Sequence, residues 1–299
     1  MEGTSFLNSL VSRRELVRIL VLLALLLGAQ NSIACTSDGR EGFMPDNDMK
    51  IPVGAKNANS MTEERFNEII DKVEAVYAPI IKKDRKARLK VNRKWEDDTV
   101  NASAQQFWKL WIVNMYGGLA RHPAVTDDGF ALVVCHELGH HLGGAPKNSF
   151  PMTWASNEGQ SDYFASLKCF RKVFGEDDNA RIIANMKLDP VAVEKCSEQW
   201  GNEEDKNLCI RAAMAGKSLA TLLGGGTRSV SFKTPDTTVV DSTYDRHPKG
   251  QCRLDTYFQG SLCNQPHTTD VSKRDATVGT CNRSTSDTVG VRPLCWYKP

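Results

Sequence analysis

Several features that mark particular classes of protein are missing from this sequence of 299 residues. Its longest apolar run, at 19–29, falls short of the roughly 20 residues that a membrane-spanning helix needs, and no long apolar run follows it. The 38 basic and 36 acidic residues leave a net charge of only +2, too little for a strong attraction to nucleic acid or to an anionic membrane. There is no internal repeat. An apolar fraction of 40% is nevertheless enough for a large buried core.

The N-terminal residues have the layout of a secretory signal peptide. Arginines precede the apolar run at 19–29, and Ser32 and Ala34 are small residues that suit cleavage before Cys35. We therefore expect residues 1–34 to be removed and the protein to be exported to the periplasm, to the cell envelope or to the medium. Cleavage leaves Cys35 at the new N-terminus, so a lipid anchor on this cysteine, and with it contact with a membrane, stays open as an alternative.

Nine cysteines support export, because scattered cysteines at long spacings usually cross-link an exported chain. None of them belongs to a CxxC pair, so a zinc ribbon held by cysteines is not supported. We expect several disulfides, formed in an oxidising compartment. If Cys35 carries a lipid, eight cysteines remain to pair with one another, and the spacing leaves their connectivity open.

The hydrophobic pattern divides the chain into the signal peptide at 1–34, a polar linker at 35–60, a domain at 61–255, and a loop-rich, cysteine-rich segment at 256–299. The domain contains some stretches with apolar residues at helical spacing and others in which apolar and polar residues alternate as in strands, which predicts an α+β fold. Strands are expected at 87–95, 100–104 and 107–115, and helices are expected to begin near Thr62 and Thr126 and to cover 157–173, 178–186 and 203–223.

A zinc-binding pattern stands near the end of the helix that begins at Thr126. His136 and His140 are one helical turn apart on the same face, so both imidazoles can reach one ion. Glu137 points beside that face, where it can take a proton from a water molecule on the metal. Zinc binds imidazoles and carboxylates in a tetrahedral site with one position open for water. HExxH also arises by chance in helices, so the pattern needs support from elsewhere in the chain.

Such support comes from Glu158 and Asp162, which are four residues apart and share one helical face. Glu158 can complete the ligand set for one Zn²⁺ per chain, while Asp162 can accept the outer N–H of a ligating histidine and fix its orientation. The alternative is an ordinary helix N-terminus, where the helix dipole favours acidic residues. The coincidence of both patterns favours the metal site.

The motifs together resemble those of the gluzincin metallopeptidases, and within them the CAAX prenyl protease and HtpX-like type. HELGHH at 136–141 and NEGQSD at 157–162 are similar to the zinc-helix and glutamate-helix motifs of that family. Further stretches match in the right order, namely VNA at 100–102, YGGL at 116–119, and His247-Pro248 followed by Arg253. The resemblance covers roughly residues 87–254.

The resemblance implies a minigluzincin-like fold, in which two active-site helices pack on a small, mostly antiparallel sheet. It also implies that an edge strand binds the substrate as an extended peptide, and 107–115 is the corresponding stretch here. His247 and Asn101 become candidates for stabilising the oxyanion of the tetrahedral intermediate. Unlike the integral-membrane members, this chain has no long apolar span after residue 30, so an intramembrane chamber and a farnesylated substrate are not expected. The segment at 256–299 lies outside the match.

We therefore predict a zinc endopeptidase that acts on exported or envelope proteins, with His136, His140 and Glu158 as ligands and Glu137 as the general base. No nucleic-acid partner is expected. One alternative is a latent or scaffold protein with a zinc site, whose cleft the segment at 256–299 would cover. Another is a zinc hydrolase that acts on a non-peptide amide.

Four residues are excluded from the ligand set by their positions. His141 points elsewhere on the helix, toward the surroundings of the site or toward solvent. Cys135 also faces away from His136, and a disulfide or a buried thiol is expected there. His122 and His267 have no partner pattern and are expected at the surface.

Overall fold

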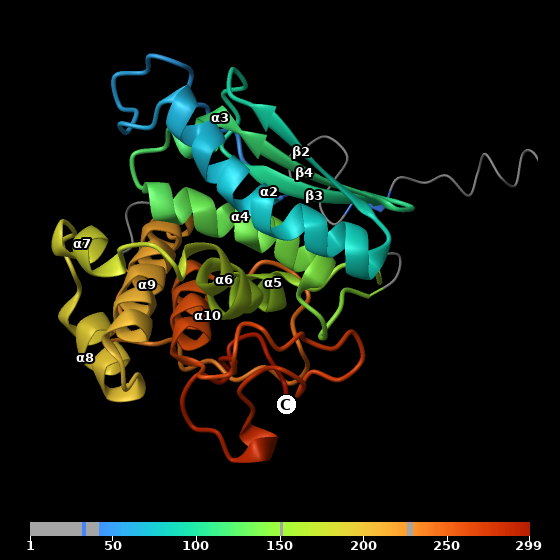
Figure 1. Cartoon of the computed structure of the whole chain (residues 1–299), viewed down its shortest axis with the longest axis vertical. Coiled ribbons are helices and arrows are strands. Elements are labelled where there is room, and N and C mark those ends of the chain that lie inside the picture. The colour runs from blue at the N-terminus through green and yellow to red at the C-terminus, as the bar shows by residue number, and fades with distance from the viewer. Residues whose placement is uncertain (1–31, 34–41, 150–151, 226–229) are drawn as a thin grey trace, which may run out of the picture.

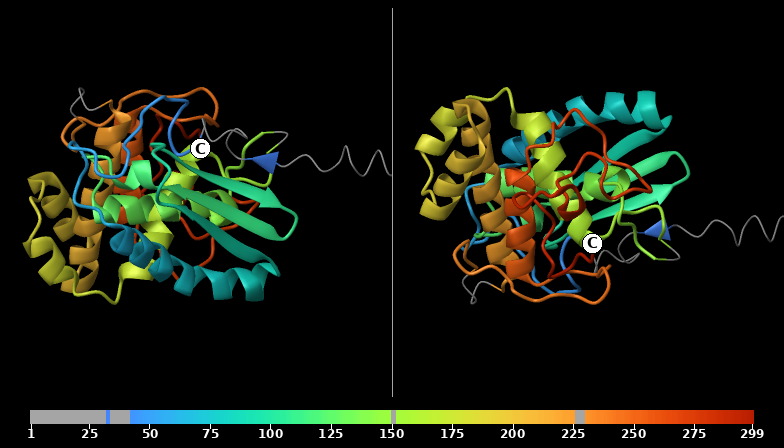
Figure 2. Two further views of the ribbon diagram at one scale, coloured as in Figure 1. Left: turned by 90° about the horizontal axis from the view of Figure 1, so that it is seen from above. Right: turned by 90° about the horizontal axis from the view of Figure 1, so that it is seen from below.

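The computed structural model describes residues 32–33, 42–149, 152–225 and 230–299, and it has an α+β fold. A small sheet and the long helix α2 (Glu63–Arg85) lie at one end of the molecule, and most of the other helices and a long coil lie at the other end (Figure 1). Helix α4 (Asp127–Leu142) runs between these two parts. Two further views show the strands fanning out to one side, away from the helical part (Figure 2).

The sheet is mixed and has the strand order β1-β3-β4-β2. Strand β4 (Leu110–Tyr116) pairs antiparallel with β3 (Ala102–Phe107) on one side and parallel with β2 (Arg88–Lys94) on the other. The short strand β1 (Ser32–Ile33) pairs antiparallel with β3. The expected strands are confirmed. The sheet is mixed rather than purely antiparallel, because β4 turns back from β3 and inserts between β3 and β2, so that two of the three pairings are antiparallel and the third is parallel.

The predicted edge strand at 107–115 is wrong. This stretch contains the turn after β3 and most of β4, and β4 has both of its edges paired. An extended peptide therefore cannot add to it. Strand β3, which flanks β4, contacts the central helix α4, and its outer side pairs with β1 at Gln105 and Gln106.

Side-chain caps begin several of the helices. Thr62, Thr126 and Asn157 each accept a hydrogen bond from the backbone N–H three residues further on. Helix α4 is buried on almost every side, which makes it the central element of the core. The remaining helical elements are α3 (Gly117–Ala120), α5 (Glu158–Phe164), the π-helix η1 (Ala165–Phe170), α6 (Arg171–Phe174), α7 (Asn179–Ala184), α8 (Pro190–Gln199), α9 (Glu203–Leu223), α10 (Gly250–Leu262) and the 3₁₀ turn η2 (Arg283–Thr285).

Two helices, α8 and α10, are not indicated by the sequence pattern. Helix α10 runs through the expected boundary between residues 255 and 256, so the cysteine-rich segment begins inside a helix. The single helix expected at 157–173 is interrupted by η1, in which the backbone hydrogen bonds shift by one residue.

Four disulfides pair the eight cysteines of the described residues. Cys135–Cys169 joins α4 to η1, which confirms the disulfide that was one expectation for Cys135. The other pairs are Cys196–Cys209, Cys252–Cys295 and Cys263–Cys281. Four disulfides indicate an oxidising, exported environment. Cys35 and the predicted signal peptide, apart from β1, lie outside the described residues, and within those residues no helix is long and apolar enough to cross a bilayer.

The segment after α10 packs against α5 and α10. The buried guanidinium of Arg292 donates to Oε1 of Gln160 in α5 at 2.7 Å. The indole of Trp296 lies directly against Gly159 in α5, and its Nε1 donates to Oγ1 of Thr256 in α10 at 2.9 Å. The cysteine-rich segment therefore supports the helix that carries Glu158.

Candidate metal centre

Two helices bring the predicted ligands together. His136 and His140 lie on α4, and Glu158 is the first residue of α5. The helices approach so closely that a Cβ atom on Gly139 would lie 2.9 Å from the Cα and the carbonyl oxygen of Ser161. A residue without a side chain, between the two histidines, therefore allows Glu158 to reach the imidazoles.

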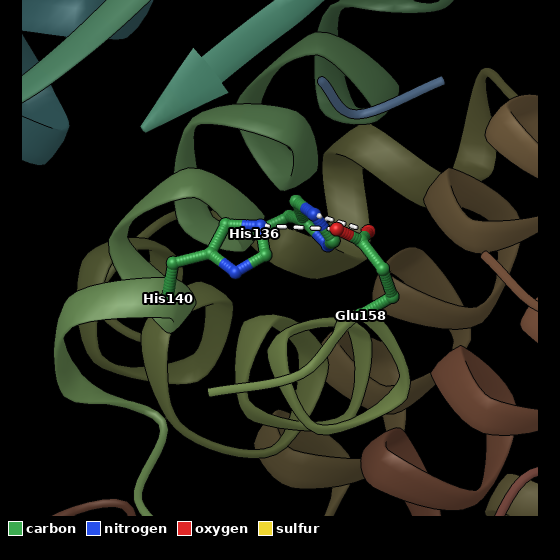
Figure 3. A group of neighbouring side chains, drawn as sticks. All are labelled: His136, His140 and Glu158. Carbon is green, nitrogen blue, oxygen red and sulfur yellow. Dashed lines mark ion pairs between the residues drawn. The ribbon is translucent and has the colours of Figure 1, made fainter. Parts of the chain in front are cut away.

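His136, His140 and Glu158 form a compact, buried triad (Figure 3). Each offers one ligand atom, and these atoms lie within 4.8 Å of one another. The carboxylate oxygens of Glu158 are 3.3 Å from Nε2 of His136 and 3.5 Å from Nε2 of His140. Among the described residues, neither Nε2 atom has an aligned hydrogen-bond partner, and neither does Oε2 of Glu158. Buried polar atoms rarely lack a partner, so three that face one another fit a cation between them.

Both histidines are held through their outer nitrogen atoms. Nδ1 of His136 lies 2.7 Å from Oδ1 of Asp162, and Nδ1 of His140 lies 2.8 Å from the carbonyl oxygen of Ser156. An acceptor at Nδ1 favours the tautomer that carries its proton there and leaves the Nε2 lone pair for a metal. Asp162 thus stands where the sequence predicted it.

Asp162 lies at the centre of a buried polar network. Its two oxygens accept hydrogen bonds from Nε and Nη2 of Arg253 at 2.6 and 2.7 Å, and the hydroxyl of Tyr257 donates to it as well. Burial alone would raise the pKa of Asp162, but the charges and hydrogen bonds of Arg253 and His136 together outweigh it and lower that pKa. Burial alone would lower the pKa of His136, but the carboxylates of Asp162 and Glu158 together raise it to about 9. A metal at Nε2 must displace this proton.

Glu137 has the environment of a proton carrier. Its carboxylate is fully buried beside the triad, and neither oxygen has a hydrogen-bond partner within the described part of the chain. Burial raises the pKa of Glu137 to about 8. A cation in the triad would lower this pKa again, because it favours the charged form. A carboxylate with a pKa near neutrality and without competing bonds can accept and return a proton.

The two residues expected near the oxyanion are both in contact with the segment at 42–44. Nε2 of His247 lies 2.6 Å from the carbonyl oxygen of Gly42 and 3.5 Å from Oε2 of Glu158. Asn101 accepts a hydrogen bond from the N–H of Met44 at 3.0 Å and donates to its carbonyl oxygen at 3.3 Å. His247 therefore belongs to the immediate surroundings of Glu158, and Asn101 holds the segment that His247 contacts.

The histidines excluded by the sequence pattern stay outside the triad. His141 is buried between the rings of Trp111 and Trp154, with centroids 4.9 Å away on each side, so it does not face solvent. Burial lowers the pKa of His141 to about 3, which keeps it neutral. His122 and His267 are half-buried.

Sequence reasoning missed the hydroxyl of Tyr257 and the carbonyl of Ser156, and it also missed Phe43, whose ring packs on His136. Arg253 and Tyr257 are four residues apart, a spacing that would have placed both on one face of a helix if α10 had been recognised. A second group with the composition of a metal site, formed by Asp236, Cys252 and Cys295, is explained by the disulfide between its two cysteines.

Comparisons with known proteins give no match, because no family model, no curated protein and no solved structure matches this chain significantly. The resemblance to gluzincins therefore rests on the sequence motifs alone, and the function has to be argued from the site.

Proposed function

We propose that the protein is a zinc-dependent endopeptidase that hydrolyses exported or envelope polypeptides. The observation that carries the proposal is the buried triad, in which two imidazole nitrogens and one carboxylate oxygen converge without hydrogen-bond partners among the described residues. Two nitrogens and one oxygen form a donor set of catalytic zinc, which keeps its fourth position for water.

Each neighbouring residue has a role in this proposal. A bound zinc ion would act as a Lewis acid toward a peptide carbonyl and would make water acidic enough to react near neutral pH. Glu137 accepts the proton of the attacking water and passes it to the leaving amine. Asp162, kept ionised by Arg253, holds the proton of His136 on Nδ1. His247 stands beside Glu158 and can donate a hydrogen bond to the oxyanion.

A latent or scaffold protein is the second candidate, and the burial of the site favours it. None of the triad residues or Glu137 is more than 4% exposed. In such a protein, the segment at 256–299 is expected from the sequence to cover the cleft. In the structure, the ring of Phe43, near the start of the chain, packs on His136. A hydrolase that acts on a non-peptide amide would use the same groups, and a substrate screen separates it from a peptidase.

Zinc content and cleavage of unfolded casein, measured on the same preparation, test the proposal. We expect one zinc ion in the wild type, its loss in His140→Ala, and cleavage that a chelator abolishes. Glu137→Gln should keep zinc and lower turnover at least ~100-fold, because it removes the general base. Glu194→Gln, at an exposed position on α8, is the matched control. Zinc without cleavage supports the latent protein, and a wild type that binds no zinc contradicts the proposal.

A further inference from the structure

A short N-terminal segment, residues 42–44, closes one side of the candidate metal centre. Phe43 is fully buried, although it stands in a polar stretch of the sequence. Its ring meets the imidazole of His136 edge-on, with the centroids 5.2 Å apart. The guanidinium of Arg253 lies over the same ring at 4.5 Å. The segment therefore contacts a ligand and its supporting network directly.

The backbone of this segment is bound by groups of the site. Nε2 of His247 contacts the carbonyl oxygen of Gly42 at 2.6 Å. The N–H of Phe43 donates to the carbonyl oxygen of Ala102 at 2.9 Å, and Nη1 of Arg253 donates to the carbonyl oxygen of Phe43 at 2.6 Å. With the two bonds between the side chain of Asn101 and Met44, each residue of the segment is bound through its backbone, once by the main chain of β3 and otherwise by side chains.

The segment lies on the outer edge of β3. Phe43 bonds Ala102 at one end of this strand, and β1 pairs with Gln105 and Gln106 near the other end. The opposite edge of β3 is taken by β4. An extended substrate that adds to β3 at Ala102 must therefore use the same carbonyl group that the N-terminal segment uses.

Gly42 fits this edge because it lacks a side chain. A Cβ atom at this position would lie 1.9 Å from the carbonyl oxygen of Ala102 and 2.8 Å from Oδ1 of Asn101. Both distances are too short for non-bonded atoms, and the nearer one involves backbone that cannot rotate away. The absence of a side chain at Gly42 therefore allows the backbone of the segment to pack directly against the backbone of β3.

We propose that residues 42–44 occupy the substrate edge of β3 as an internal inhibitor, so that the protein stays latent until this segment is displaced. The inhibitory meaning rests on the proposed function, whereas the occupancy itself does not depend on catalysis. His247 and Asn101, the residues expected to handle substrate, hold the segment instead. Because β1 lies within the predicted signal peptide, signal removal would free the edge at Gln105 and Gln106 and leave residues 42–44 in place.

Gly42→Val in the zinc-loaded protein without the predicted signal peptide at 1–34 tests the occupancy. The added side chain must push the segment off β3, which opens the side of the centre that Phe43 covers. We expect a chelator to remove zinc at least about tenfold faster than from the wild type. This factor follows if the state with residues 42–44 bound to β3 is favoured at least about tenfold over the state with the segment displaced. Casein cleavage should rise by a similar factor. Gly201→Val is the matched control, because open space surrounds the exposed Gly201, and it should change neither rate.

The outcomes separate this inference from the proposed function. Faster zinc removal without cleavage in any variant supports the occupancy and contradicts the peptidase. Unchanged zinc removal and cleavage, in a Gly42→Val protein whose Phe43 amide exchanges freely with solvent, overturns the inference.

If Gly42→Val does not fold, a competition experiment on the wild type tests whether residues 42–44 occupy the edge of β3. A synthetic peptide with the sequence of residues 42–48 should compete for β3 once its concentration exceeds the effective concentration of a tethered segment, which is on the order of millimolar. Exchange of the Phe43 amide with solvent should then accelerate, as hydrogen exchange measured by NMR would show. Exchange that stays unchanged under these conditions would mean that the segment is a permanent part of the fold.

Discussion

Replacing Asp162 by asparagine should weaken both the fold and the metal centre, and the two effects can be measured separately. Asp162 and Arg253 are fully buried and share two hydrogen bonds, at 2.6 and 2.7 Å. Removal of one partner of a buried ion pair leaves the other charge uncompensated, which costs about 3–5 kcal/mol. We expect Asp162→Asn to lower the free energy of unfolding of the zinc-free protein, with its disulfides intact, by this amount in urea titrations.

The same substitution should also weaken zinc binding through His136. The amide that replaces the carboxylate can still accept a hydrogen bond from Nδ1, but it no longer carries the negative charge that supports the imidazole. Loss of such an outer partner typically reduces metal affinity by about 10–100-fold, or roughly 1.4–2.7 kcal/mol. Competition with a chromophoric chelator measures this change directly.

Asp128→Asn provides the matched control, because Asp128 is also a buried carboxylate paired with one arginine. Its oxygens accept from Arg211 at 2.7 and 2.9 Å, and it lies about two turns of α4 before His136. We expect unchanged zinc affinity and a smaller loss of stability than in Asp162→Asn, because Arg211 keeps its ion pair with Asp177 at 2.8 Å. If Asp162→Asn lowers the free energy of unfolding by less than about 1 kcal/mol, Asp162 and Arg253 do not form a charged, desolvated pair. Equal zinc affinity in the wild type and in Asp162→Asn would refute the role of this network at the metal centre.

Other predictions address the remaining parts of the site. Glu158→Ala should reduce zinc affinity and activity together, and unchanged zinc content would remove Glu158 from the ligand set. Zinc binding at pH 7 should release at least one proton, because the pKa of His136 is about 9 in the zinc-free protein and the ligand must be neutral. Affinity should therefore rise with pH up to about 9, and calorimetry in two buffers of different ionisation enthalpy counts the protons. Replacing Cys135 and Cys169 together by serine should cost about 2–5 kcal/mol of stability, as a urea titration would show.

The candidate ligands could be predicted because helical geometry places them locally. The spacing of His136 and His140 fixes their common face wherever the helix lies, and the same holds for Glu158 and Asp162. The histidines on α4 and Glu158 on α5 come together because Gly139 allows the two helices to approach closely, and Gly139 is itself part of the HELGHH motif.

The sheet order and the far side of the site could not be predicted for physical reasons. Strand periodicity shows which residues share a face, but it does not show that β4 inserts between β3 and β2. Helix α10 has a weak apolar stripe because its buried face includes Arg253 and Asp255, which are normally surface residues. Phe43 is a single aromatic residue in a polar stretch, and one residue carries no periodicity that would place it in the core.

Arg253 links the metal centre to the proposed inhibitory segment. One side of its guanidinium holds Asp162, which orients His136, and Nη1 donates to the carbonyl oxygen of Phe43. Displacement of the segment would leave this buried donor without that acceptor, which is costly in a site that excludes water. The carbonyl of a substrate peptide bound along β3 could replace it. The guanidinium of Arg253, which keeps Asp162 ionised, therefore also favours the binding of a peptide along β3 in place of residues 42–44. A substrate should for this reason displace the segment more effectively than heat or denaturant does.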